Sequence, residues 1–326
     1  MNWDNIDWNA LERMRLAFLA GTAGAQDYWR TESDVAAYDT TFAQRIGWKW
    51  DFVLAELRQR GWTPPAGEVL DWGCGSGVAG RAFLDHFGTE AITRLRLWDR
   101  SPLAVAFAAR RAQAKYAQLT VATTMLPENF AGDTLLISHV LTELTPEQTQ
   151  ALVELATTAQ CVIWVEPGTY EASLTLIAIR ERLRAHFQVV SPCTHQARCG
   201  ILAPENERHW CHHFATSPPE VFTDRDWARF ANQMGIDLRD LPVSFLVLDK
   251  RPAPALPADA ARLIGHPRLY KGHALVLGCD TTGVADRRVM KRQFPTEYRA
   301  FKKGDAPSLC QWKCENTEVT SFKAAG

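Results

Sequence analysis

Three cysteines lie close together in the segment SPCTHQARCGILAPENERHWCHHF, residues 191–214. Cys193, Cys199 and Cys211 follow the spacing C-x5-C-x11-C, and four histidines lie among them. A free cysteine is often a small core residue, but here prolines, a glycine and charged residues surround the thiols and indicate a loop. Thiols and imidazoles grouped in a loop are typical of metal ligands, so we predict a metal site here.

A closed tetrahedral site needs a fourth ligand. Cys279 is the best candidate, because it lies in LGCDTTG, a C-terminal segment that is typical of a β-hairpin and could fold back. The alternative ligands lie in the loop and in the tail: His195, His209, His212, His213, Cys310 and Cys314. Cys74 and Cys161 are expected to be packing residues. Four thiolates suit zinc and iron–sulfur clusters alike, so ligand type leaves the metal open.

A second candidate site is the glycine-rich stretch VLDWGCGSG. Gly73, Gly75 and Gly77 stand where a predicted strand turns into a helix, and glycines there allow a tight turn and close approach of a ligand. Asp99 ends the next predicted strand, 22 residues beyond Gly77. An acid at this place can accept both hydroxyls of a ribose, so the expected ligand contains adenosine.

The residue before the glycines indicates which adenosine cofactor binds. Asp71 completes the order D-x-G-x-G-x-G, which resembles motif I of class I methyltransferases that use S-adenosylmethionine (SAM). A dinucleotide-binding loop would read G-x-G-x-x-G instead, and a carboxylate at position 71 would repel a pyrophosphate. The resemblance implies two groups of contacts: Asp71, Gly73, Gly75 and Gly77 with the methionine part of SAM, and Asp99 with the ribose.

The segment after the fourth predicted strand, ISHVLTEL, lies where many methyltransferases contact their acceptor. It has neither an N-P-P-Y-like loop nor a Pro-Cys nucleophile. His139 is the candidate general base. The alternative is that Ser138 and His139 cap a helix or line the cofactor site, and we prefer it because no second catalytic group accompanies them. The catalytic residue therefore stays unassigned, and Met125 or Leu126 is the expected adenine contact.

Short apolar runs alternate with helix-period segments between residues 67 and 250. The predicted strands are 68–72, 95–99, 119–123, 133–138, 161–166, 187–191 and 243–249. Leu176, Ile179, Leu183 and Phe187 form the apolar stripe of one intervening helix, and Thr145 with Gln148 is typical of a capping box that begins another. This alternation predicts an α/β fold with a Rossmann-like, mostly parallel sheet covered on both faces.

Changes in composition divide the chain into three parts. Residues 1–66 are predicted to be helical and end at TPPAGE, and residues 67–250 form a SAM-binding methyltransferase-like domain that includes the Cys-rich loop 190–216. Residues 251–326 begin with a Pro/Ala linker and form a basic extension with a β-hairpin. Residues 251–303 carry a net charge of +7 and the rest of the chain carries −8. The candidate RNA-binding cations are Arg287, Arg288, Lys291 and Arg292; a merely solvated face is the alternative.

The composition, 46% hydrophobic and 22% charged in 326 residues, is that of a globular protein. It contains no run of about 18 uncharged apolar residues, and its first residues resemble neither a secretory signal nor a transit peptide. We therefore expect a cytoplasmic location, no membrane association and a monomer. Eight cysteines without an export signal should stay reduced, which favours a metal over disulfides.

The chain resembles the methyltransferase-like small-ribosomal-subunit assembly family of mitochondria and bacteria over about residues 35–295. The resemblance depends on the order of the motifs DWGCGSG, ISHVLTEL, VEPGTYEA, SPCTHQARC, HWCHHF and KGHALVLGCDTTG. It implies a class I methyltransferase fold that binds SAM, associates with the maturing small ribosomal subunit and carries a [4Fe–4S] cluster. The implied cluster ligands are Cys193, Cys199, Cys211 and Cys279.

Three functions follow as hypotheses. The first is a ribosome assembly factor that binds SAM and ribosomal RNA, in which the cluster holds the loop and the hairpin so that the basic segment is presented. The second is a working SAM-dependent methyltransferase acting on RNA or protein. The third is a small-molecule methyltransferase whose cysteine site holds zinc.

Overall fold

The structure is a computed structural model, and it describes residues 3–4, 6–25, 27–125, 130 and 132–324. The chain folds into two compact units. Unit 1 consists of Met1–Arg58, Thr63–Glu166 and Ala215–Leu241, and unit 2 consists of Gln59–Trp62, Pro167–Phe214 and Pro242–Gly326.

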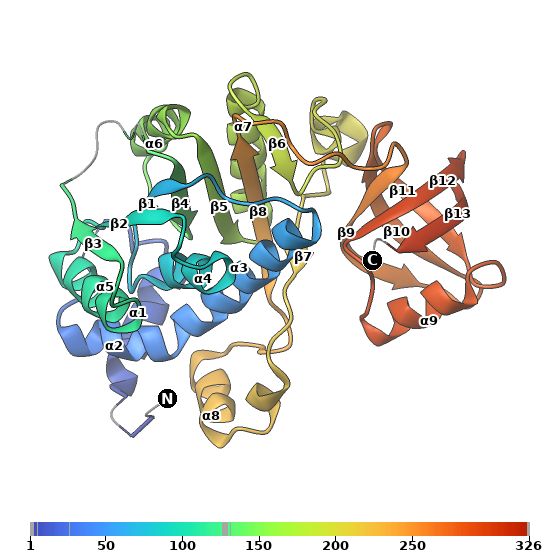
Figure 1. Ribbon diagram of the computed structural model, residues 1–326. Helices are drawn as coiled ribbons and strands as arrows, with labels where there is room; N and C mark the ends of the chain where they lie inside the picture. The colour runs from blue at the N-terminus through green and yellow to red at the C-terminus, as the bar shows by residue number, and fades with distance from the viewer. Residues whose placement is uncertain (1–2, 5, 26, 126–129, 131, 325–326) are drawn as a thin grey trace. The chain divides into compact units, whose positions relative to one another are not determined.

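Parallel strands in the order β3-β2-β1-β4-β5 form the centre of unit 1 (Figure 1). Their bounds are Gly67–Trp72 for β1, Ile92–Trp98 for β2, Thr120–Thr123 for β3, Thr134–Ser138 for β4 and Cys161–Pro167 for β5. Asp71 near the end of β1 aligns with Leu97 on one side and Leu136 on the other, so the ends of the central strands meet at one edge. The predicted parallel Rossmann-like sheet is confirmed.

A helix follows each of the strands β1, β2 and β4: α4 (Val78–Phe87), α5 (Pro102–Lys115) and α6 (Pro146–Thr158). The capping box that begins α6 is confirmed, since the Thr145 hydroxyl accepts from the Gln148 amide and the Gln148 side chain accepts from the Thr145 amide. Such reciprocal bonds satisfy two amides that a helix start leaves without intrahelical partners. The start of α6 is therefore determined by residues that are close together in the sequence.

The remaining helices of unit 1 share an aromatic core. They are α1 (Trp8–Leu19), α2 (Glu32–Thr40), α3 (Phe42–Gln59) and α8 (Arg225–Met234), with the short 3-10 helix η3 (Pro219–Phe222) before α8. Trp29, Phe42, Trp227 and Phe230 are buried together in this core. Rings of this size bury large apolar areas, and edge contacts such as Phe42–Phe230 at 5.1 Å add to that stabilisation.

In unit 2, strands β6 (Gln188–Ser191) and β7 (His213–Phe214) both pair antiparallel with β8 (Pro242–Asp249). Helix α7 (Tyr170–Leu183) precedes β6. Leu176, Ile179 and Leu183 of its predicted stripe are buried, whereas Phe187, also buried, lies beyond the end of the helix. The segment between β6 and β7 contains the three clustered cysteines and two 3-10 turns, η1 (Gly200–Leu202) and η2 (Pro204–Asn206). The Cys-rich stretch is thus a loop, as its composition indicates.

Five strands of unit 2 close into a β-barrel in the order β10-β11-β13-β12-β9. They are β9 (Ala260–Leu269), β10 (His273–Asp280), β11 (Gly283–Met290), β12 (Leu309–Glu315) and β13 (Glu318–Ala324) (Figure 1). Helix α9 (Pro295–Lys303) follows β11 and precedes β12 along the chain. The expected hairpin is present as β10–β11. Strands β9, β12 and β13 are not predicted from the sequence, because their apolar residues become a core only when the barrel closes around Trp312 and Phe301.

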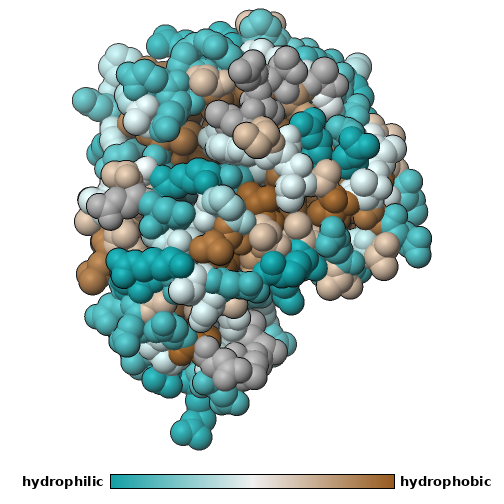
Figure 2. Space-filling model, turned by 90° about the vertical axis from the view of Figure 1, so that its left-hand side faces the viewer, coloured by the Kyte–Doolittle hydropathy of each residue, from teal (hydrophilic) through white to brown (hydrophobic). Residues whose placement is uncertain are grey.

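Among the described residues, few large hydrophobic side chains are exposed. On the face that Figure 2 shows, hydrophilic residues predominate and hydrophobic residues form smaller patches among them. Among the described residues, none of the helices combines the length and the apolar character needed to cross a membrane.

Candidate functional site

The glycine loop between β1 and α4 depends on backbone conformations that favour glycine. Gly73, Gly75 and Gly77 have φ values of 67°, 50° and 80°. A Cβ atom at Gly73 would lie 2.9 Å from Val140 Cγ1, and one at Gly77 would lie 2.9 Å from Ala108 Cβ, whereas Gly75 has open space. The first and third glycines therefore allow close packing, and the second leaves room beside the loop.

Asp71 lies under this loop and is fully buried. Its Oδ2 accepts a hydrogen bond of 2.9 Å from the Gly80 amide in the first turn of α4. Burial raises the pKa of the Asp71 carboxyl to about 7. Asp71 thus stabilises the start of α4, and it is not among the residues that line the neighbouring cavity.

Asp99 links the ends of the first two strands. Its Oδ2 accepts from the Gly75 amide at 2.9 Å and its Oδ1 accepts from the Ser101 amide at 2.9 Å. These bonds orient the carboxylate, while burial, the largest influence, raises its pKa. Each carboxylate oxygen can accept a second bond, so Asp99 can still receive ligand hydroxyls.

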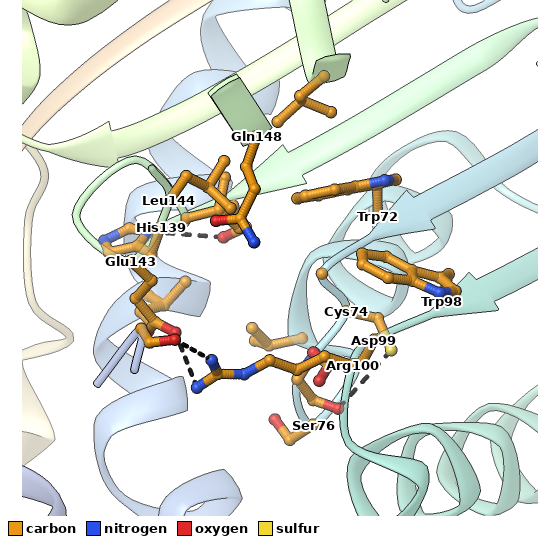
Figure 3. A pocket seen from close by; sticks show the side chains of 18 of the residues that line it. Trp72, Cys74, Ser76, Trp98, Asp99, Arg100, His139, Glu143, Leu144 and Gln148 are labelled. Atoms are coloured by element: carbon orange, nitrogen blue, oxygen red, sulfur yellow. Dashed lines mark hydrogen bonds and ion pairs between the residues drawn. The ribbon is translucent and has the colours of Figure 1, made fainter. Parts of the chain in front are cut away.

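A cavity of about 450 Å³ opens beside the loop (Figure 3). Trp72 and Trp98 stand together on one side of it, with ring centroids 4.6 Å apart, and His139 and Glu143 lie on the other. Further lining residues include Gly73–Ser76 of the loop, Asp99 and Arg100 after β2, Tyr28 and Tyr38 of the N-terminal part, and Gln148 of α6. A cavity with mostly apolar walls and a few convergent polar groups is typical of a cofactor site.

Arg100 binds the N-terminal part of the chain beside this cavity. Its guanidinium donates to the Ala23 and Gly24 carbonyls and lies 3.7 Å from Glu143 Oε2 (Figure 3). The Tyr28 hydroxyl donates to Glu143 Oε1 at 3.4 Å. Burial raises the pKa of Glu143 to about 7. The Tyr28 segment is therefore held in place by polar groups from β2 and from the turn before α6.

His139 lines the same cavity with a φ of 55°, which is rare for a side-chain-bearing residue. Its Nε2 lies 3.3 Å from Lys49 Nζ and its Nδ1 lies 3.4 Å from Ser138 Oγ, which accepts from Trp50 Nε1. Burial lowers the pKa of His139 well below its usual value and that of Lys49 to about 7. The geometry keeps the imidazole neutral and oriented.

The predicted cofactor residues thus occupy two different positions. Gly73, Gly75 and Asp99 line the cavity, whereas Asp71 and Gly77 lie behind it. Met125 is 87% exposed and does not line the cavity, and Leu126 lies outside the described residues. Sequence reasoning missed Trp72, Trp98, Tyr28 and Arg100; only the two tryptophans had a signal, an aromatic residue at the end of each strand.

The four cysteines singled out in the sequence line a second, small cavity of about 20 Å³ within unit 2. Cys193, Cys199 and Cys211 come from the β6–β7 loop and Cys279 comes from β10. Among the alternative ligands only His195 lines this cavity, with its Nε2 3.5 Å from Cys279 Sγ. Apolar side chains close the remainder, including Ile201, Ile264 and Val284.

Two arginines lie against the thiols. Arg180 Nε donates to Cys193 Sγ at 3.2 Å, and its guanidinium also donates to the Ala197 carbonyl at 2.9 Å. Arg262, 1% exposed, lines the cavity and donates to the Pro192 carbonyl at 3.0 Å. Arg180 had a signal in the sequence: it lies four residues after Leu176, on the buried stripe of α7, where a charge needs a partner.

The cavity disfavours thiolates unless positive charge is supplied. Burial, and then the neighbouring thiol of Cys193, raises the pKa of Cys199 to about 11. Burial also raises the pKa of Cys211 and Cys279 well above that of an ordinary thiol. Bound metal would stabilise the ionised sulfurs, because ligand thiolates require a cation.

Within the described part of the chain, no three Cys, His, Asp or Glu side chains are arranged to hold a metal ion. All eight cysteines are free thiols. The four thiols nevertheless line one cavity, with Arg180 and Arg262 beside them.

The predicted RNA-binding cations differ in accessibility. Arg287, with 12% of its side chain exposed, lies 3.7 Å from Asp280 Oδ2 and donates to the Asn316 carbonyl at 2.7 Å. It is held within the barrel. Arg288, Lys291 and Arg292 are exposed.

The strand order and the glycine-loop cavity together define a protein of the class I methyltransferase fold. Residues 50–306 match the family described as mitochondrial small ribosomal subunit Rsm22. The chain belongs to this family, and it is thus a methyltransferase-fold member of a small-ribosomal-subunit family.

Solved methyltransferases are similar to part of the chain. A candidate RNA methyltransferase from Pyrococcus horikoshii is 12% identical, with 61% of this chain and 80% of that chain covered and a TM-score of 0.39. A SAM-dependent methyltransferase from Aquifex aeolicus is 17% identical over 50% and 92%, with a TM-score of 0.38. Precorrin-6y C5,15-methyltransferase from Geobacter metallireducens is 13% identical over 62% and 87%, with a TM-score of 0.37. No curated protein matches the chain.

Proposed function

We propose that this protein is a SAM-binding, iron–sulfur-containing assembly factor of the small ribosomal subunit that contacts ribosomal RNA. The observation that carries the SAM assignment is the position of Asp99 on the cavity wall beside Gly73 and Gly75. The Asp99 carboxylate would accept the ribose hydroxyls, and Gly75 leaves the backbone open to the methionine part. Trp72 and Trp98 would form the apolar wall beside the cofactor.

SAM binding is tested by calorimetry with the purified chain. A binding isotherm with one site is expected, and Gly75→Val should abolish it by filling the open space beside the loop. Lys115→Ala, an exposed change on α5, is the matched control. The SAM assignment is wrong if the chain does not bind SAM or SAH.

An active RNA methyltransferase is the alternative, and His139 is the observation that favours it. A neutral imidazole on the cavity wall could accept a proton from the group that receives the methyl, with Lys49 3.3 Å away as its partner. Radiolabelled methyl transfer onto immature small subunits decides between the two. Transfer that disappears in His139→Ala and Asp99→Ala would favour the enzyme.

The cysteine cavity is the proposed site of a structural [4Fe–4S] cluster held by Cys193, Cys199, Cys211 and Cys279. Bound there, the cluster would join the β6–β7 loop to β10 within unit 2 and so fix the loop on the barrel. Anaerobic purification with iron, sulfide and zinc analysis tests this proposal. If the analysis finds one zinc ion and no iron per chain, the site is a zinc site. That result would favour the third function, a small-molecule methyltransferase.

Ribosome association is proposed from the family match and from the exposed cations of the barrel. Arg288, Lys291 and Arg292 would contact phosphate, and Arg287 would act indirectly by holding the barrel together. Replacing the three exposed cations by alanine should weaken binding to small-subunit particles and reduce its salt dependence. Unchanged binding would exclude this surface.

Several further expectations belong to the same proposal. We propose a monomer that acts in the cytoplasm, although the family description names a mitochondrial subunit, and fractionation of cells with size-exclusion chromatography tests both points. We also propose residues 1–66, 67–250 and 251–326 as the functional parts of the chain.

A further inference from the structure

The C-terminal barrel has the topology of an oligonucleotide-binding fold. Numbered within the barrel, β9 to β13 close in the order 1-2-3-5-4, and the third and fifth strands, β11 and β13, are parallel. Helix α9 lies between the third and fourth strands, and its Phe301 is buried in the barrel core. Barrels of this topology bind oligonucleotides and oligosaccharides on the face of their second and third strands.

That face is divided into a covered half and an open half. Register pairs Cys279 with Val284 and Leu277 with Asp286, and Leu277, Cys279 and Val284 are buried with Ile201 of the Cys-rich loop. Further along, Leu275 pairs with Arg288 on β11. Arg288 is exposed and Leu275 is half-buried, so this half is accessible.

The open half ends at a pair of stacked rings. Tyr270, 48% exposed, stacks on His273 with ring centroids 4.8 Å apart and planes 12° apart. His273 lies two residues before Leu275 on β10, so both point to the same side of the strand. The Tyr298 hydroxyl of α9 donates to the Tyr270 carbonyl at 2.6 Å, which fixes the loop that carries the ring.

Cations surround the rings. Lys291 Nζ lies 5.2 Å from the centre of the Tyr298 ring, and the Lys291 amide donates to the Gly272 carbonyl at 3.0 Å. Arg268 on β9, the strand partner of Leu275 on β10, is another nearby cation. The exposed cations nearby are Lys271, Arg288 and Arg292. Asp286 is the acid on this face; it forms ion pairs with Arg268 and Arg208 and so offsets part of that charge.

We propose that this open half binds a single-stranded segment of RNA, with one base stacked on Tyr270 and His273 and its phosphates near Arg288, Lys291 and Arg292. An exposed flat ring pair suits an unpaired base, because every base has a stacking face and a duplex hides it. This inference rests on the proposed contact with ribosomal RNA. It adds a class of ligand, single-stranded RNA, and a means of recognition other than charge.

The test measures fluorescence anisotropy of the full chain with a labelled oligouridine of about 12 nucleotides, within the site size expected for such barrels. Tyr270→Ala with His273→Ala should weaken binding roughly 10-fold, the loss of about one stacked base, and leave the salt dependence unchanged. Tyr270→Phe keeps the ring and should bind as the wild type does. Circular dichroism and thermal unfolding establish that the variants are folded.

Removing the cations, unlike removing the rings, should change the salt dependence of binding. Replacing Arg288, Lys291 and Arg292 by alanine should lower the slope of log affinity against log salt by about 2. Lys313→Ala with Lys323→Ala, exposed on β12 and β13, is the control with cations removed elsewhere on the barrel.

Two outcomes overturn the inference. The first is unchanged affinity of the folded Tyr270→Ala, His273→Ala variant for oligouridine, and the second is equal or tighter binding of a duplex of the same length. If the affinity of that aromatic variant for oligouridine is unchanged while the cation variant loses binding to small-subunit particles, the proposed function stands without the stacking site. If the wild-type chain binds neither oligouridine nor small-subunit particles, the proposed function fails as well.

Discussion

The cavity beside the glycine loop and the cavity beside the cysteines differ in how the chain builds them. The first is about 450 Å³ and takes its polar residues from strand ends that the parallel sheet brings to one edge. The second is about 20 Å³ and joins a loop to a strand whose cysteine lies 68 residues further along the chain. The parallel sheet therefore positions the polar residues of the first, whereas the second depends on the contact between a loop and a barrel.

The two cavities also differ in charge. The carboxyl groups of Asp99 and Glu143 line the first, and burial raises the pKa of Asp99 and brings that of Glu143 to about 7. Thiols dominate the second, and Arg180 and Arg262 lie against it. The two proposed ligands differ in the same way: SAM carries hydroxyls and a positive charge, and the proposed cluster would supply positive charge to thiolates. Changes in one should leave the other intact.

The largest expected effect is on the cysteine site. Cys279→Ser should lose nearly all bound iron and the visible absorbance of anaerobically purified protein, because three ligands on a loop would remain without their anchor on β10. SAM binding should be retained. Cys314→Ser, a half-buried thiol on β12 that does not line the cavity, is the control. Full iron content in Cys279→Ser would remove this residue from the ligand set.

The next effect concerns the first cavity. Asp99→Ala should lower SAM affinity by about 100-fold, since two hydrogen bonds to a charged group contribute about 1.5 kcal/mol or more each. Calorimetry measures this loss, and iron content should not change. Asp85→Ala, on the outer side of α4 beside Lys115, should bind SAM normally. Equal affinity in Asp99→Ala would show that the ribose lies elsewhere.

A smaller effect is expected from the turn that shapes the loop. Gly77→Ala should lower the free energy of unfolding by about 1–3 kcal/mol, because φ is 80° and the new Cβ would meet Ala108. Gly21→Ala is matched to it, with a φ of 65° but open space around the Cβ. Chemical unfolding followed by tryptophan fluorescence compares the two. A Gly21→Ala variant that loses as much would mean that the contact with Ala108 contributes nothing.

The smallest effect is a change of slope with pH. Burial keeps the Asp71 carboxyl protonated in the folded protein up to about pH 7, whereas the unfolded carboxyl ionises near pH 4. The folded state therefore holds the extra proton in that window, and the contribution of Asp71 to stability is full below about pH 4 and is lost as the pH rises through 7. Asp71→Asn should flatten this part of the profile and still accept the Gly80 amide. A profile identical to the wild type would mean that Asp71 ionises normally.

The sequence alone determined those features that depend on neighbours along the chain. The order of strands and helices, the turn at Gly73–Gly77, the capping box of Thr145 and the loop character of residues 191–214 all follow from local patterns. Hydrophobic period and glycine placement act over a few residues, so they are readable before the chain folds. They were sufficient for the α/β class and for the position of Asp99.

Tertiary structure decided which side chains meet. Asp71 belongs to a motif, but burial under the loop turns its carboxylate toward Gly80 instead of the cavity. Arg287 stands in a basic run, yet closing of the barrel places it beside Asp280 and leaves Arg288 exposed. Arg180, Tyr270 and His273 acquire their neighbours only through packing of distant segments. Burial and contact depend on the whole fold, so a local sequence pattern does not predict them.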